Sequence, residues 1–112
     1  MNWIYLNSEE SFTKLLKDSE SKDVIIFKHS STCSISHSAK YRLEDKWNFD
    51  DIDPYLLDIK SYRNISNTIS EMLNVHHESP QLLLLRNREC IYDASHFDIT
   101  AEELRETLSY HE

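Results

Sequence analysis

The sequence predicts an α/β fold in which helices flank a mixed central sheet. Over most of the chain, short apolar runs alternate with amphipathic, helix-like stretches, a pattern typical of parallel β-α-β units. Near the C-terminus, two apolar runs are separated only by a short turn, which indicates an antiparallel hairpin. A well-marked helix follows. The predicted order is β-α-β-α-β-α-β-β-α.

The first predicted unit is a strand over residues 3–6 followed by a helix. Asn7 comes just before Glu9 and Glu10, so we expect it to cap a helix with an acidic first turn. Three apolar residues of this helix share one face through their i, i+3, i+4 spacing: Phe12, Leu15 and Leu16.

The second unit contains the strongest strand signal. Residues 23–29 include four consecutive apolar residues rich in β-branched side chains, as in a strand buried on both faces. A turn carrying Cys33 follows, and then a predicted helix from Ser34 to about Phe49. Its apolar stripe comprises Ile35, Ala39, Leu43 and Trp47.

A third unit is predicted from a strand at residues 54–59 and a helix at residues 64–73. The helix stripe comprises Ile65, Ile69, Met72 and Leu73. The chain contains no glycine, so positions with positive φ must fall to residues such as Asn or Asp. Asn74, at the end of this helix, and Asn87 are the expected ones.

The last elements are a hairpin and a helix. Residues 82–85 and 90–92 are the two strands, joined by a turn at residues 86–89. Thr100 and Glu103 form the pattern of a capping box for the final helix. Its expected hydrophobic staple joins Ile99 to Leu104. A parallel β-α-β start followed by a hairpin and a covering helix is a thioredoxin-like order.

Composition limits the classes of function. The 112 residues fit one domain, residues 1–112. Twenty acidic against twelve basic residues give a net charge of −8, which argues against binding to nucleic acid. No apolar run approaches the roughly 20 residues of a membrane helix, and the N-terminus lacks a cationic signal-peptide region. We expect a cytoplasmic protein, without membrane contact, and a monomer.

Cys33 carries the main chemical signal, because a strand leads into it and a helix starts after it. Cysteines at a helix N-terminus ionise more readily than free cysteine. Cys33 and Ser36 form a C-x-x-S motif, so no disulfide can close across it, and we expect the Ser36 hydroxyl to donate a hydrogen bond to the sulfur. Four nearby side chains are expected to favour the thiolate: Lys28, His29, His37 and Lys40.

The polar residues Thr32 and Ser34 on either side of Cys33 indicate an exposed thiol. Ser79 and Pro80 precede the fourth strand, and a cis peptide bond there would place a turn beside that thiol. The alternative is an ordinary proline that starts a strand.

Other reactive patterns are weaker. Cys90 lies in a predicted strand, so we expect a packed thiol and no bridge to Cys33. The histidines His29, His37, His76 and His77 lack metal-ligand spacing, so no metal site is predicted. Nor does a glycine-bearing nucleophile turn indicate a hydrolase. The acidic stretch Asp50, Asp51 and Asp53 is expected to be a solvated loop.

The segments Thr32-Cys33-Ser34-Ile35-Ser36 and His77-Glu78-Ser79-Pro80-Gln81 closely resemble the YtxJ-type family of bacillithiol-system redox proteins, the monothiol bacilliredoxins. The likeness runs over nearly the whole chain and includes Arg63 through Asn67. The family motif is typically Thr-Cys-Pro-Ile-Ser, so Ser34 departs from it. The resemblance implies a thioredoxin fold with a cis-proline loop.

It also implies removal of bacillithiol from mixed disulfides on cytosolic proteins, with Cys33 attacking and Ser36 tuning it. The implied groove residues are Thr32, Ser34, Ser79 and Pro80. Bacillithiol would then be a co-substrate, with no bound cofactor. Two other functions stay open: a non-catalytic thioredoxin-like module that binds proteins, and a dithiol enzyme or redox sensor that uses Cys90.

Overall fold

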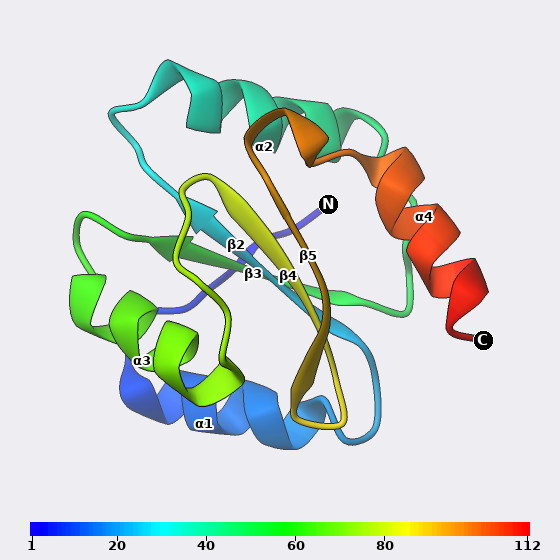
Figure 1. Cartoon of the computed structure of the whole chain (residues 1–112), viewed down its shortest axis with the longest axis horizontal. Coiled ribbons are helices and arrows are strands. Elements are labelled where there is room, and N and C mark those ends of the chain that lie inside the picture. Colours follow the sequence, from blue (N-terminus) through cyan, green and yellow to red (C-terminus); the bar gives the residue numbers. More distant parts are fainter.

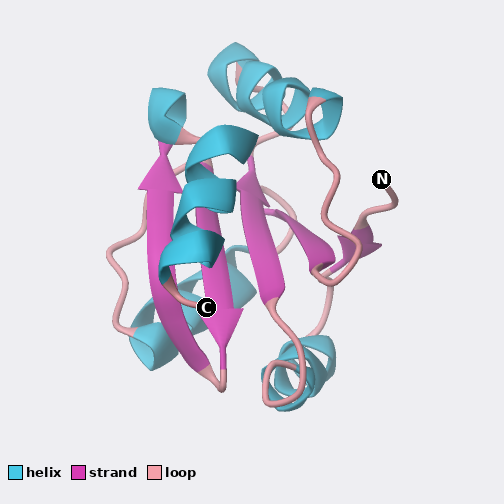
Figure 2. Cartoon of the chain, turned by 90° about the vertical axis from the view of Figure 1, so that its right-hand side faces the viewer, coloured by secondary structure: helices cyan, strands magenta, loops and turns pink.

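The computed structural model describes residues 1–112 as a five-stranded sheet between two layers of helices (Figures 1 and 2). Helices α1 and α3 cover one face of the sheet, and α2 and α4 lie on the other side (Figure 1). The element order confirms the prediction, apart from an added 3₁₀ helix, η1, at His96–Asp98. The remaining elements are β1 Ile4–Tyr5, α1 Glu9–Asp18, β2 Val24–His29, α2 Ser34–Asp45, β3 Asp53–Asp58, α3 Arg63–Leu73, β4 Gln81–Arg86, β5 Glu89–Ser95 and α4 Ala101–Tyr110.

The sheet is mixed, as predicted. Its strand order is β1-β3-β2-β4-β5. Strands β1 and β2 run parallel to β3, whereas β4 runs antiparallel to both β2 and β5. Strand β2 therefore lies at the centre, and the carboxyl ends of β2 and β3 share one edge with the start of β4.

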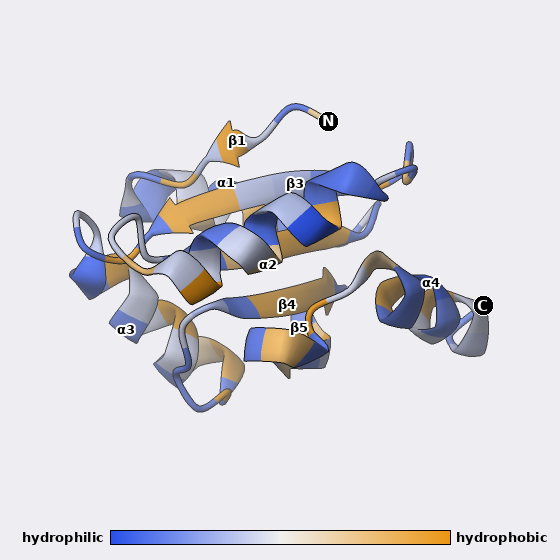
Figure 3. Ribbon diagram, turned by 90° about the horizontal axis from the view of Figure 1, so that it is seen from above, coloured by the Kyte–Doolittle hydropathy of each residue, from blue (hydrophilic) through white to orange (hydrophobic).

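Strand β2 is buried along its whole length and packs on both faces, as expected for its unbroken apolar run. Because side chains alternate along a strand, Val24 and Ile26 join the core on the α1 and α3 face. Ile25 and Phe27 join the core on the α2 and α4 face. The strands on either side of β2, β3 and β4, carry hydrophobic colours over much of their length in Figure 3. The same alternation directs the side chains of Lys28 and His29, at the end of β2, to opposite faces of the sheet.

Several predicted helix boundaries are corrected. The cap of α1 is Ser8, not Asn7: Ser8 Oγ accepts a hydrogen bond from Ser11 N at 3.0 Å, and Ser11 Oγ accepts one from Ser8 N at 3.1 Å. Helix α2 ends at Asp45, before a segment of aromatic, Asn and Asp residues with low helix propensity. Of the residues assigned to the apolar stripes, Ile35 and Met72 are 42% and 61% exposed.

The turns show how a chain without glycine reaches positive φ. Asn74 and Asn87 have φ of 54° and 52°, as predicted, but Arg88 and His96 also have positive φ. Asn87 and Arg88 form the two-residue loop between β4 and β5, which requires positive φ in its favoured form. Ser19 holds this loop, because its carbonyl accepts from Asn87 N at 2.7 Å and its hydroxyl accepts from Arg88 N at 2.9 Å.

The cap of the last helix is simpler than predicted. Thr100 Oγ1 accepts a hydrogen bond from Glu103 N at 3.1 Å, but the reciprocal bond of a capping box is not formed. None of the helices has the length and apolarity needed to cross a membrane.

Candidate active site

Three loops meet at the edge of the sheet where β2 and β3 end and β4 begins. The last residue of β2, His29, pairs with Asp58 at the end of β3. Lys28, one residue earlier, pairs with Gln81 at the start of β4. The loop before α2, the turn before α3 and the loop before β4 therefore lie at one edge, and the first of them carries Cys33.

Cys33 is the N-cap residue of α2, with φ −110° and ψ 122°. Its amide donates to Ser30 O at 3.1 Å, and its carbonyl accepts from His37 N at 3.1 Å. The side chain is half-buried, and its neighbours Thr32 and Ser34 are exposed. Helix α2 begins at Ser34, so a helix starts after the thiol even though serine stands where the related motif has proline.

Ser36 does not contact the thiol, which corrects the predicted hydrogen bond. The residue is fully buried, and its Oγ accepts from Ser30 N at 3.0 Å and lies 2.6 Å from His29 Nδ1. No hydrogen bond joins Ser36 to Cys33. The reason is helix geometry: position 36 faces the sheet, over the end of β2, whereas position 33 precedes the first turn. Ser36 thus ties the loop before Cys33 to α2.

His29, at the end of β2, is the second hydrogen-bond partner of Ser36. Burial lowers the pKa of His29, and the charges of His37 and Lys40 lower it further, which favours the neutral ring. In the neutral ring, Nδ1 can accept a hydrogen bond from the Ser36 hydroxyl group. Ser36 Oγ is then free to accept the hydrogen bond that Ser30 N donates. His37 packs edge-on against His29, with ring centroids 4.8 Å apart, and its Nε2 donates to Ser31 O at 2.7 Å. No three His, Cys, Asp or Glu side chains converge as metal ligands.

Two of the four side chains expected to support a thiolate are committed elsewhere. Lys28 points to the α3 face, because it follows Val24 and Ile26 in the alternation of β2. Its Nζ donates to Ser66 O at 3.3 Å, to Ser70 Oγ at 3.0 Å and to His77 Nδ1 at 3.3 Å. Lys40 forms an ion pair with Glu44 at 2.8 Å. The expected local excess of positive charge around Cys33 is therefore smaller than the sequence indicates.

The loop before β4 contains the predicted cis peptide bond between Ser79 and Pro80. Pro80 is buried, and its carbonyl accepts from His96 N at 3.1 Å. The side chain of Gln81, also buried, braces the loop by donating from Nε2 to His76 O at 3.0 Å. Ser79 Oγ is buried without a hydrogen-bond partner, which is unusual for a hydroxyl group.

Cys90 lies at the opposite end of the sheet. It pairs with Leu85, which pairs with Val24 at the start of β2, whereas Cys33 follows the end of β2. Strand β2 has six residues, so its first and last Cα atoms are five steps apart, or about 16.5 Å at roughly 3.3 Å per step. A disulfide needs Cα atoms within about 7 Å. The Cys90 thiol donates to Tyr92 O at 3.3 Å, and burial raises its pKa, as expected for a packed thiol.

Sequence reasoning did not identify His29 as the partner of Ser36, or Gln81 as the brace of the cis-proline loop. The alternation of β2 could have found His29, because it shares a face with Ile25 and Phe27. No pattern indicated Gln81, whose partners lie within a loop of irregular structure.

Comparison with known proteins adds an independent line of evidence. The family model described as monothiol bacilliredoxin BrxC matches residues 4–104. A solved structure described as a proposed oxidoreductase with a thioredoxin fold is 32% identical, with a TM-score of 0.84, and the match covers 94% of this chain and 92% of that one. Two thioredoxins, from Trypanosoma brucei brucei and Malassezia sympodialis, are each 14% identical, with TM-scores of 0.78 and 0.76. Each match covers 98% of this chain and 90% of the other. The predicted thioredoxin-like fold is confirmed.

Proposed function

The chain belongs to the monothiol bacilliredoxin family, and from that premise we propose that it removes bacillithiol from mixed disulfides on proteins. A thiol redox function follows from the family and the fold. The observation that carries the finer proposal is the setting of Cys33, a half-buried cysteine at the N-cap of α2. It has a serine at the fourth position of its motif and a cis-proline loop at the same edge of the sheet.

In the first step, the Cys33 thiolate attacks the bacillithiol sulfur of a mixed disulfide. The bond between the two substrate sulfurs breaks, and a new disulfide forms between Cys33 and bacillithiol. The substrate cysteine leaves as a thiolate and takes a proton from water. The substrate cysteine is thereby reduced to a thiol, and Cys33 is oxidised to a mixed disulfide with bacillithiol.

The second step regenerates Cys33. Ser36 has no sulfur, and Cys90 lies at the opposite end of the sheet from Cys33, so an external thiol is required. A second bacillithiol thiolate attacks the bacillithiol sulfur of the adduct, forms bacillithiol disulfide and releases the Cys33 thiolate. Bacillithiol is thus a co-substrate, and no bound cofactor takes part.

Ser36 and His29 are positioning residues in this proposal. Their hydrogen bonds hold the backbone of Ser30, three residues before the thiol, and so fix the loop that presents it. The proposed contact surface for substrate comprises the exposed residues Thr32 and Ser34 beside the thiol, together with Ser79 and Pro80 of the cis-proline loop.

The partners proposed are bacillithiolated proteins and bacillithiol itself. Action in the cytoplasm, as a single domain over residues 1–112 and as a monomer, fits a small protein that works on cytosolic thiols. A reducing compartment would also keep Cys33 and Cys90 as free thiols between turnovers.

The test uses a peptide that carries bacillithiol on one cysteine. Wild type and Cys90→Ser are expected to release the free peptide, and mass spectrometry should find bacillithiol on Cys33 of both proteins. Cys33→Ser should release none. Equal release by Cys33→Ser and wild type would refute the proposal, and a Cys33–Cys90 disulfide in the wild type, in place of bacillithiol on Cys33, would show that a dithiol mechanism operates instead.

A further inference from the structure

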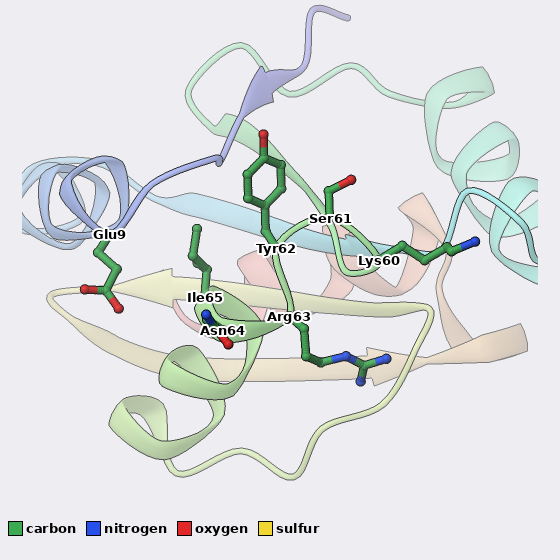
Figure 4. A pocket seen from close by; sticks show the side chains of 7 residues that line it. All are labelled: Glu9, Lys60, Ser61, Tyr62, Arg63, Asn64 and Ile65. Atoms are coloured by element: carbon green, nitrogen blue, oxygen red, sulfur yellow. The ribbon is translucent and has the colours of Figure 1, made fainter.

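An open pocket of about 380 Å³ lies between the start of α1 and the segment that joins β3 to α3. Residues 60–65 line it on one side, and Glu9 lines it on the other. In Figure 4, the side chains of Lys60 and Arg63 extend to the same side of the pocket, away from Glu9. Both cations thus lie on the side of the turn that faces away from Glu9.

This turn is a direct neighbour of the loop that carries Cys33. Ile59 N donates to His29 O at 3.0 Å, so the chain leaving β3 is hydrogen-bonded to the end of β2. Cys33 follows His29 by four residues, and its amide is bonded to Ser30 O. The pocket and the thiol therefore lie on adjacent loops at the same edge of the sheet.

Neither cation of this turn is held in an ion pair by the protein. Lys60 and Arg63 are exposed and form no ion pair. The acid in the turn, Asp58, accepts hydrogen bonds from Lys60 N and Ser61 Oγ, each at 3.2 Å, and so caps the turn.

Lys28 is a buried third cation, close enough to Arg63 for the two charges to interact. Its hydrogen-bond partners are all neutral. Burial lowers the pKa of Lys28 to about 8, and the charge of Arg63 is the next contribution, so Lys28 remains mostly protonated at neutral pH. The chain as a whole has a net charge of −8, so the three cations Lys28, Lys60 and Arg63 form a positively charged group on an acidic protein.

We infer that Lys60 and Arg63 form a subsite for the carboxylates of bacillithiol, which holds the molecule while its sulfur reaches Cys33. The inference rests on the proposed function. Bacillithiol carries two carboxylates on its malate group, and an arginine guanidinium matches a carboxylate in two-point geometry. Small thiols such as 2-mercaptoethanol have no carboxylate, so loss of either cation should affect the bacillithiol adduct and spare the 2-mercaptoethanol adduct.

The first test compares two adducts of one peptide, with bacillithiol or with 2-mercaptoethanol, in single-turnover reactions with reduced protein at low ionic strength. Lys60→Gln and Arg63→Gln should each lower the rate constant for the bacillithiol adduct about tenfold, the worth of one charge-assisted hydrogen bond. The rate constant for the 2-mercaptoethanol adduct should not change. Lys17→Gln, which removes an exposed charge without an ion pair from α1, is the matched control.

The second test measures binding without chemistry. S-methyl bacillithiol cannot exchange its sulfur, so its affinity for the Cys33→Ser protein is read by NMR titration. Adding Arg63→Gln should weaken binding about tenfold, and adding Lys17→Gln should leave it unchanged. Equal binding with and without Arg63→Gln, or equal rate losses on both adducts, overturns the inference. Charge-dependent binding in a protein that releases no bacillithiol would contradict the proposed function alone.

Discussion

Replacing the buried lysine of β2 should stabilise the protein. Lys28 is 1% exposed, and its ammonium group has no acidic partner, only Ser66 O, Ser70 Oγ and His77 Nδ1. Burying a charge without a counter-charge is costly. Lys28→Met removes the charge and keeps a side chain of similar length, so we expect a more stable protein at pH 7.

The magnitude follows from the pKa of Lys28. Burial, together with the charge of Arg63, lowers it from 10.5 to about 8. Each pH unit corresponds to about 1.36 kcal/mol, so holding Lys28 protonated in the fold costs at most about 3 kcal/mol below pH 8. The partners keep other bonds after the substitution, because Ser70 Oγ also donates to Ser66 O and Ser66 Oγ contacts His77 Nδ1.

The sign of the pH dependence provides the check. The unfolded chain binds the Lys28 proton more tightly than the folded chain, so wild-type stability should rise as pH increases from about 8 to 10.5. The advantage of Lys28→Met should shrink over that range. Urea unfolding of both proteins between pH 7 and 10.5 measures it, with Lys17→Met as an exposed control expected to change stability by under about 0.5 kcal/mol. A less stable Lys28→Met protein at pH 7, or an advantage independent of pH, would refute the reasoning.

Two further predictions concern the groups beneath Cys33. Ser36→Ala leaves the half-buried Ser30 amide without its acceptor, so it should lower the free energy of unfolding by about 1–3 kcal/mol and slow alkylation or exchange at Cys33. Unchanged urea midpoints would contradict this prediction. The pKa of His29 is lowered by burial, then by His37 and Lys40, so the unfolded chain binds that proton more tightly and stability should fall as pH drops below about 6.5. His29→Gln should flatten this acid limb relative to wild type, and identical limbs in the two proteins would exclude His29 as its cause.

The sequence was sufficient for the parts of the fold that depend on local patterns. The apolar run of β2 predicted a strand buried on both faces, and the absence of glycine directed the left-handed helix end to Asn74. The same patterns misplaced the helix cap by one residue, because Asn7 and Ser8 are both good caps and only the contact with Ser11 decides between them. When two neighbouring residues are equally good helix caps, only the three-dimensional hydrogen bonds show which of them is used.

The site was harder to predict, because its groups come from separate segments. Lys28 and His29 are neighbours in sequence, yet alternation along β2 sends one under α3 and the other under α2. Cys33 and the cis-proline loop were identified from motifs. Lys60 belongs to no motif, and Arg63 stood out only as the start of a segment that resembles the family. Their relation to Cys33 depends on the pairing of β2 with β3.

The position of Ser36 connects the single-thiol motif to the need for an external thiol. The hydroxyl is fully buried and used twice, by the backbone of Ser30 and by the ring of His29. The fourth position of the motif is therefore a structural support of the loop, and the mixed disulfide on Cys33 cannot be resolved from within the motif. On the proposed mechanism, the resolving thiol must arrive from solution and be recognised. A positively charged turn beside the thiol loop then has a function, because it would favour a carboxylate-bearing thiol over neutral thiols in the same compartment.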